Sequence, residues 1–165
     1  MVLLTAERSL GSRAEAEDIA QEVFCAVLRK VKTLREPERL RSFIYSFAVR
    51  MLKAELRRRR VRGWFPFFTP EPPPEVLFRA SDFESRDLLH KLYGLLDRLT
   101  PRDRLVFVLR RMESMTVEEI ATTMDISIST VKRSIAYASG RLSRWVEADP
   151  ELAGLARGEH WGRRR

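Results

Sequence analysis

The chain has 165 residues, of which 44% are hydrophobic and 33% charged, and its formal net charge is +8. This hydrophobic fraction is that of a folded globular protein rather than a disordered chain, and the absence of any apolar run of about 18 residues excludes insertion into a membrane. The single cysteine, Cys25, fits a reducing cytoplasm, and with two histidines the composition predicts no metal site and argues against an enzyme.

The first part of the chain shows the period of amphipathic helices. Between Glu15 and Val31, apolar residues recur at steps of three and four and are predicted to form one buried face. These residues are Ile19, Ala20, Val23, Phe24, Val27, Leu28 and Val31. After a break around Pro37, a longer helix is predicted from Glu38 to Arg60. No alternating strand pattern competes, so the predicted fold class is all-α.

Charge and proline content divide the chain into segments. Residues 1–62 carry 15 basic and 8 acidic side chains, which indicates a polyanionic partner. Residues 63–85 contain five prolines and are predicted to link two small helical domains, 1–62 and 86–147, with 148–165 as a C-terminal tail. The linker aromatics are expected either to pack on the first domain or to meet a partner, and they are Trp64, Phe65, Phe67 and Phe68.

Capping residues mark three helix starts in the second domain. Thr100 precedes a proline at the first helical position, Thr116 and Glu119 form a capping box, and Ser127 is a third cap. The helices predicted in this part are Leu88–Leu99, Pro101–Met112, Val117–Met124 and Ile128–Trp145.

The last two of these helices, with the turn Asp125–Ser127 between them, have the spacing of a helix-turn-helix. The second helix is predicted to bury a stripe made of Val131, Ile135, Ala138 and Leu142. Its opposite face would present short polar and cationic side chains to a DNA major groove, and these are Ser129, Lys132, Arg133, Ala136 and Tyr137. The competing interpretation is a helical hairpin with a solvated face.

The segment from Thr116 to Leu142 resembles region 4 of sigma factors of the extracytoplasmic-function group, within the sigma-70 family. Glu119-Ile120-Ala121 and Thr130-Val131-Lys132 carry this match. Ala16 to Phe24 resembles the region 2 helix that docks on RNA polymerase, and Ser42 to Ala48 resembles the segment that opens the −10 promoter element. The resemblance implies a bacterial, cytoplasmic transcription initiation factor without a cofactor, whose partners are core RNA polymerase, promoter DNA and an anti-sigma factor.

The resemblance also implies roles for particular residues. Asp18, Gln21 and Glu22 would contact the polymerase, and Thr130 would join the polar face that recognises the −35 element. The residues expected at the −10 element are Arg35, Phe43, Tyr45, Arg50, Lys53, Arg57 and Arg58. The two aromatics of this set either stack on unpaired bases or belong to the core. The arginines either bind phosphates or form a solvated helix end.

Some positions depart from the family pattern. Asp125 stands where the family has a glycine in the turn, and aspartate tolerates the left-handed backbone less readily. Tyr137, Ser139 and Gly140 stand where the family often has arginines. The alternative function is a helix-turn-helix regulator that acts without polymerase. An enzyme is the third interpretation. Against it, the sequence contains no phosphate-binding loop and no nucleophile constellation.

Overall fold

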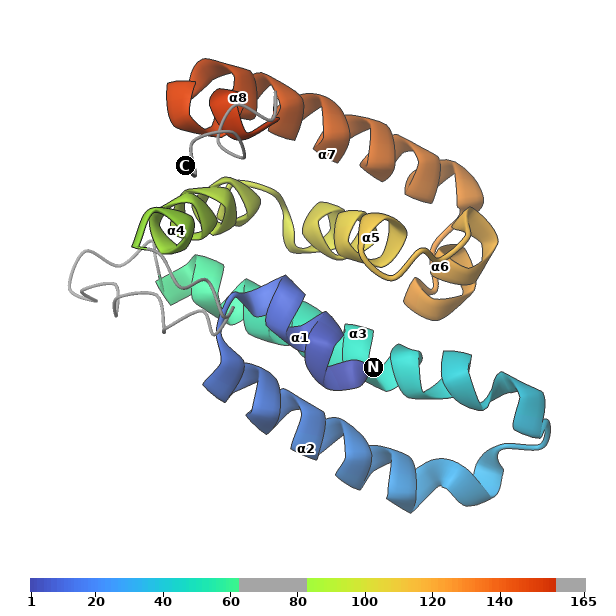
Figure 1. Cartoon of the computed structure of the whole chain (residues 1–165). Helices are drawn as coiled ribbons and strands as arrows, with labels where there is room; N and C mark the ends of the chain where they lie inside the picture. Colours follow the sequence, from blue (N-terminus) through green and yellow to red (C-terminus); the bar gives the residue numbers. More distant parts are fainter. Residues whose placement is uncertain (63–82, 157–165) are drawn as a thin grey trace, which may run out of the picture.

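A computed structural model describes residues 1–62 and 83–156. The helices are α1 Val2–Leu10, α2 Arg13–Lys30, α3 Leu40–Arg62, α4 Phe83–Asp97, α5 Pro101–Arg111, α6 Val117–Met124, α7 Ile128–Ala148 and α8 Pro150–Ala156, with 3-10 turns at Val31–Thr33 and Pro37–Arg39. The described residues contain no strand, and the predicted all-α class is confirmed. Figure 1 shows α2 and α7 on opposite sides of the molecule, with α1, α3, α4 and α5 between them.

The first half is a small bundle of α1, α2 and α3. Two residues separate α1 from α2, and Gly11 makes the sharp turn with a left-handed φ of 74°. Ser12 then caps α2 by accepting a hydrogen bond from the Glu15 backbone N–H at 3.3 Å. A Cβ at position 11 would lie 2.9 Å from Cδ1 of Tyr93, so both the backbone angle and this close approach require glycine.

Three helices of the second half begin where the sequence predicts them, whereas α4 begins at Phe83 and ends at Asp97 rather than spanning the predicted Leu88–Leu99. The Thr100 hydroxyl oxygen accepts from the Asp103 backbone N–H at 3.2 Å, and Ser127 accepts from that of Thr130 at the same distance. Thr116 and Glu119 form the complete capping box, with hydrogen bonds of 3.1 and 2.7 Å. Such bonds satisfy backbone donors that have no partner inside the helix. The three predicted helix starts are therefore confirmed.

The packed fold extends beyond the predicted boundary at residue 147. Helix α7 continues to Ala148, and α8 packs against α4 and α7 with Leu152 and Ala153 buried. The Asp149 carboxylate caps α8 by accepting from two backbone N–H groups at 3.1 and 3.2 Å. Residues 148–156 thus belong to the fold rather than to a tail. The remaining tail and the linker aromatics lie outside the described residues.

The two halves share one hydrophobic core. Helix α3 packs against α5 and α6, and α1 packs against α5. Leu52 of the first half belongs to the same buried cluster as Leu109 and Ile120 of the second. A smaller cluster joins α4, α8 and the end of α7. The sequence predicts two helical units, and the structure adds that they are packed together.

None of the helices within residues 1–62 and 83–156 is both long enough and apolar enough to cross a membrane.

Candidate nucleic-acid interface

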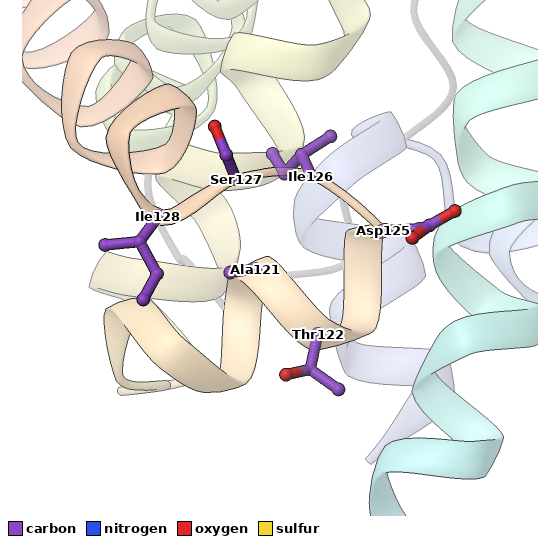
Figure 2. Close-up of a pocket in the computed structure, with 6 residues that line it drawn as sticks. All are labelled: Ala121, Thr122, Asp125, Ile126, Ser127 and Ile128. Atoms are coloured by element: carbon purple, nitrogen blue, oxygen red, sulfur yellow. The ribbon is translucent and has the colours of Figure 1, made fainter.

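Helices α6 and α7 form a helix-turn-helix in which α6 and the start of α7 are those predicted, while α7 ends at Ala148 rather than Trp145. Figure 2 shows the turn between the two helices. Asp125 adopts the left-handed conformation with φ 53° and ψ 55°, which explains how aspartate replaces the family's glycine. The Ile126 backbone N–H donates to the Ala121 carbonyl at 3.0 Å, and its side chain is half-buried against the core. The turn is therefore held both by this backbone hydrogen bond and by the packing of the Ile126 side chain.

The buried stripe of α7 holds the helix against the rest of the second half. Val131, Ala138 and Leu142 are buried as predicted, and Ile135 is half-buried. Ser134 is also buried, which the sequence pattern does not indicate. Because this stripe is fixed, the opposite face of α7 has a defined orientation.

That opposite face is open. The side chains predicted to meet DNA are exposed, and they are Ser129, Lys132, Arg133 and Tyr137. Thr130 is half-buried, and its hydroxyl lies 2.8 Å from that of Ser127. Arg133 and Tyr137 border a hollow of about 230 Å³ that also includes Arg102 at the start of α5. Arg102 is a cation beside this face that the sequence analysis missed, because it lies on another helix.

A second candidate surface follows one side of α3. Phe43 and Phe47 are half-buried, with ring centroids 5.1 Å apart in an edge-to-face arrangement. The guanidinium of Arg50 lies 5.7 Å from the centre of the Phe47 ring, and Arg57 continues the same stripe at the next turns. Steps of four, three and seven residues place these side chains on one face. Phe47 is not among the residues predicted from the sequence, although this spacing indicates it.

Tyr45 does not belong to that surface in this structure. Its side chain is fully buried, and its hydroxyl donates to Oε2 of Glu113 at 2.9 Å. Burial raises the pKa of the Tyr45 phenol above its ordinary value. Of the two interpretations of Tyr45, the structure supports the core residue, because α3 turns this side chain toward the second half.

The remaining basic side chains of the predicted −10 set differ in accessibility. Arg35, Arg50, Arg57 and Arg58 are exposed, and Lys53 is half-buried. Arg58 also forms an ion pair with Glu55 at 3.2 Å. Their neighbour Arg59 donates a hydrogen bond to the Leu10 carbonyl at 2.7 Å and forms an ion pair with the Glu15 carboxylate. The end of α3 thus combines accessible cations with one that ties α3 to the start of α2.

Helix α2 carries the third surface. Asp18, Gln21 and Glu22 are exposed, in agreement with their predicted orientation. The predicted buried face is wrong at three positions, because Phe24 is 52%, Leu28 72% and Val31 38% exposed. In the described residues, the helices that pack substantially against α2 are α1 and α3. Those two helices cover a narrow stripe from Ala16 to Val27, and the wider apolar face remains uncovered.

Three or more His, Cys, Asp or Glu side chains do not come together as a metal-binding group anywhere in residues 1–62 and 83–156.

The structure combines a helix-turn-helix, whose second helix has an exposed polar face, with the basic helical half of residues 1–62. These two features define a helical DNA-binding protein. Residues 1–62 match the family model described as Sigma-70 region 2, and residues 89–142 match that of Sigma-70, region 4. The chain is 34% identical over 139 residues to the ferric citrate uptake sigma factor FecI of Escherichia coli (strain K12). This match covers 79% of the chain and 76% of that protein.

Further comparisons agree. The chain is 30% identical over 131 residues to the RNA polymerase sigma factor SigV of Bacillus subtilis (strain 168), covering 79% of the chain and 74% of that protein. Its fold resembles the sigma factor RpoE in the co-crystal structure with the anti-sigma factor NepR from Bartonella quintana. That likeness has a TM-score of 0.69 at 17% identity and covers 90% of this chain and 91% of RpoE.

The chain therefore belongs to the sigma-70 family, as an extracytoplasmic-function sigma factor. It is a transcription initiation factor that directs RNA polymerase to promoters.

Proposed function

We propose that this sigma factor works without catalysing a reaction itself, through three surfaces that bind different partners. The outer face of α2 docks on core RNA polymerase, the aromatic stripe of α3 holds the separated strand of the −10 element, and the open face of α7 recognises the −35 duplex. The observation that carries this proposal is that three helices each carry a set of side chains that solvent reaches, fully on α2 and α7 and in part at the aromatics of α3, with α2 and α7 on opposite sides (Figure 1).

The α2 surface combines charge with apolar area. Asp18 and Glu22 supply negative charge, which favours a basic partner surface and speeds its association. Gln21, Phe24 and Leu28 follow at steps of three and four and therefore lie side by side on the helix. Exposed apolar side chains next to polar ones are typical of a protein interface. We infer that Phe24 and Leu28 belong to the polymerase-docking surface.

The α3 surface suits single-stranded DNA. Aromatic side chains stack on any unpaired base, and each stack is worth about 1–3 kcal/mol. Phe43 and Phe47 are accessible for stacking at the edge of the core, whereas Tyr45 is not. Arg50, Arg57 and Arg58 lie farther along the helix, where they would neutralise phosphates of the same strand.

The α7 surface suits a duplex. Lys132 and Arg133 can donate to the O6 and N7 atoms of guanine in a major groove. Ser129 lies in the first turn of α7, where the helix dipole favours a phosphate. Since the match to RpoE comes from a complex with an anti-sigma factor, we also propose that an anti-sigma factor regulates this chain.

The polymerase assignment is tested by reversing charge on α2. Asp18→Arg with Glu22→Arg should abolish capture of core RNA polymerase, while circular dichroism stays unchanged because both positions are exposed. Glu118→Arg with Glu147→Arg makes the same charge change at exposed positions of α6 and α7 and should bind normally. Equal capture by the two double variants would refute the assignment.

A further inference from the structure

The recognition helix α7 begins with an isoleucine that the rest of the chain leaves largely uncovered. Ile128 is the first residue of α7, and its side chain is 43% exposed. Helix-turn-helix proteins place the N-terminal residues of the second helix against the edges of bases in the major groove. Ile128 therefore lies where a base edge is contacted, and it has no polar side-chain atom with which to form a hydrogen bond to that edge.

The other side chains of this first turn bond to one another. The Ser127 hydroxyl oxygen accepts a hydrogen bond from the Thr130 backbone N–H at 3.2 Å. It also lies 3.0 Å from the hydroxyl oxygen of Ser129 and 2.8 Å from that of Thr130. The start of α7 thus presents a small network of hydroxyl groups and, beside it, the apolar side chain of Ile128.

The surroundings of Ile128 favour an uncharged group. Ile128 borders a hollow of about 440 Å³ on the outer side of the turn. Six residues line this hollow (Figure 2), and they are Ala121, Thr122, Asp125, Ile126, Ser127 and Ile128. The hydroxyls of Thr122 and Ser127 already bond within the protein. The Asp125 carboxylate would repel a DNA phosphate, so a base edge suits this surface better than the DNA backbone.

Thymine is the base whose major-groove edge matches an apolar side chain. Thymine presents its C5-methyl group there, whereas the edges of guanine, adenine and cytosine consist of hydrogen-bond donors and acceptors. A polar edge pressed against Ile128 would lose its hydrogen bonds to water without replacement. One side chain can therefore both favour thymine and disfavour the other three bases.

Lys132 relates this contact to the rest of the recognition face. It is exposed and follows Ile128 by four residues, so the two side chains lie on the same side of α7. Four residues rise about 6 Å along a helix, which is about two base pairs at 3.4 Å each. Because Lys132 can donate to the O6 and N7 atoms of guanine, the pair predicts a thymine within about two base pairs of a guanine, on either strand.

We propose that Ile128 is a specificity-determining residue, which selects a thymine in the −35 element by contact with its methyl group. The proposal rests on the proposed function of α7 as the −35 surface. It adds a base preference that the polar side chains of α7 do not supply.

A selection experiment with holoenzyme tests the base preference. Wild-type holoenzyme is given promoter duplexes with a randomised −35 element and should enrich a thymine within about two base pairs of a guanine. Ile128→Val keeps a branched apolar side chain and should enrich the same thymine, whereas Ile128→Ser should not. Leu4→Ala, at a position of α1 that is 52% exposed, is the control and should select as the wild type does. Enrichment of the same thymine by Ile128→Ser would overturn the proposal.

A chemical substitution in the DNA tests the methyl contact with the wild-type protein, so it does not depend on the folding of a variant. Deoxyuridine in place of the selected thymidine removes the methyl group alone. It should weaken binding of wild-type holoenzyme about fourfold, the effect of one buried group of this size. Ile128→Ser should bind both duplexes equally. Equal affinity of the wild type for both duplexes would refute the methyl contact while leaving the −35 assignment of α7 intact. Enrichment of no −35 sequence by the wild type would overturn that assignment, and this proposal with it.

Discussion

Leu28 provides the sharpest test of the polymerase-docking surface, because sequence periodicity predicts that it is buried and the structure shows it exposed. Burying a whole leucine side chain is worth about 1.5–3 kcal/mol. With 72% of Leu28 exposed in the free chain, its burial under polymerase would contribute about 1–2 kcal/mol. Leu28→Ala should therefore weaken binding of core polymerase by about 5- to 30-fold. The free energy of unfolding should change by less than about 0.5 kcal/mol, since the side chain makes little contact in the folded chain.

The assay is isothermal titration of core polymerase with the sigma factor, combined with urea unfolding of the free protein. Leu4→Ala is the matched control, because Leu4 is 52% exposed on α1 rather than α2. Its dissociation constant should equal that of the wild type. An unchanged dissociation constant for Leu28→Ala, or equal weakening by both variants, would refute the docking surface. Loss of stability in Leu28→Ala would show that the side chain packs within the protein.

Three further predictions concern other parts of the molecule. Thr116→Ala removes the cap of α6 and should lower the free energy of unfolding by about 1 kcal/mol, whereas Thr122→Ala on the exposed side of α6 should have a smaller effect in the same denaturation assay. Arg57→Ala with Arg58→Ala should reduce the slope of log affinity against log salt by up to about 2 for holoenzyme on promoter DNA, equally across promoter sequences; a loss confined to one sequence would contradict phosphate binding. Because burial raises the pKa of Tyr45, its stabilising contribution is present below about pH 10 and lost as the pH rises through the folded-state value. Tyr45→Phe should therefore lose less stability than the wild type as the pH rises above about 10. Identical profiles of unfolding free energy against pH in the two proteins would contradict this prediction.

Local chemistry explains why the helix-turn-helix was predictable. Thr116, Glu119 and Ser127 cap their helices through bonds to backbone groups three residues away, so these helix starts depend on neighbouring sequence alone. The left-handed turn at Asp125 is local as well, because its backbone N–H donates to the Thr122 carbonyl three residues earlier. The sequence also contains a signal for α8, since Asp149 followed by Pro150 is a helix cap and a first helical position.

The exposure of residues at the edge of a helical face could not be predicted from local sequence. A period of 3.6 residues groups Phe24 and Leu28 with Val23 and Val27, but it does not set how wide a stripe the neighbouring helices cover. Only the arrangement of α1 and α3 around α2 leaves Phe24 and Leu28 exposed. The same limit applies to Phe47, whose accessibility depends on what packs beside α3.

The sequence by itself determined the helical class, the helix-turn-helix and the family, because caps, periodicity and motifs act over a few residues. The packing of the two halves was decided only by the tertiary structure. Arg8, Tyr45 and Glu113 meet across 105 and 68 residues of chain, and no local pattern specifies such a contact. Buried area and charge complementarity, summed over the whole interface, turn Tyr45 inward while the recognition face of α7 stays in solvent.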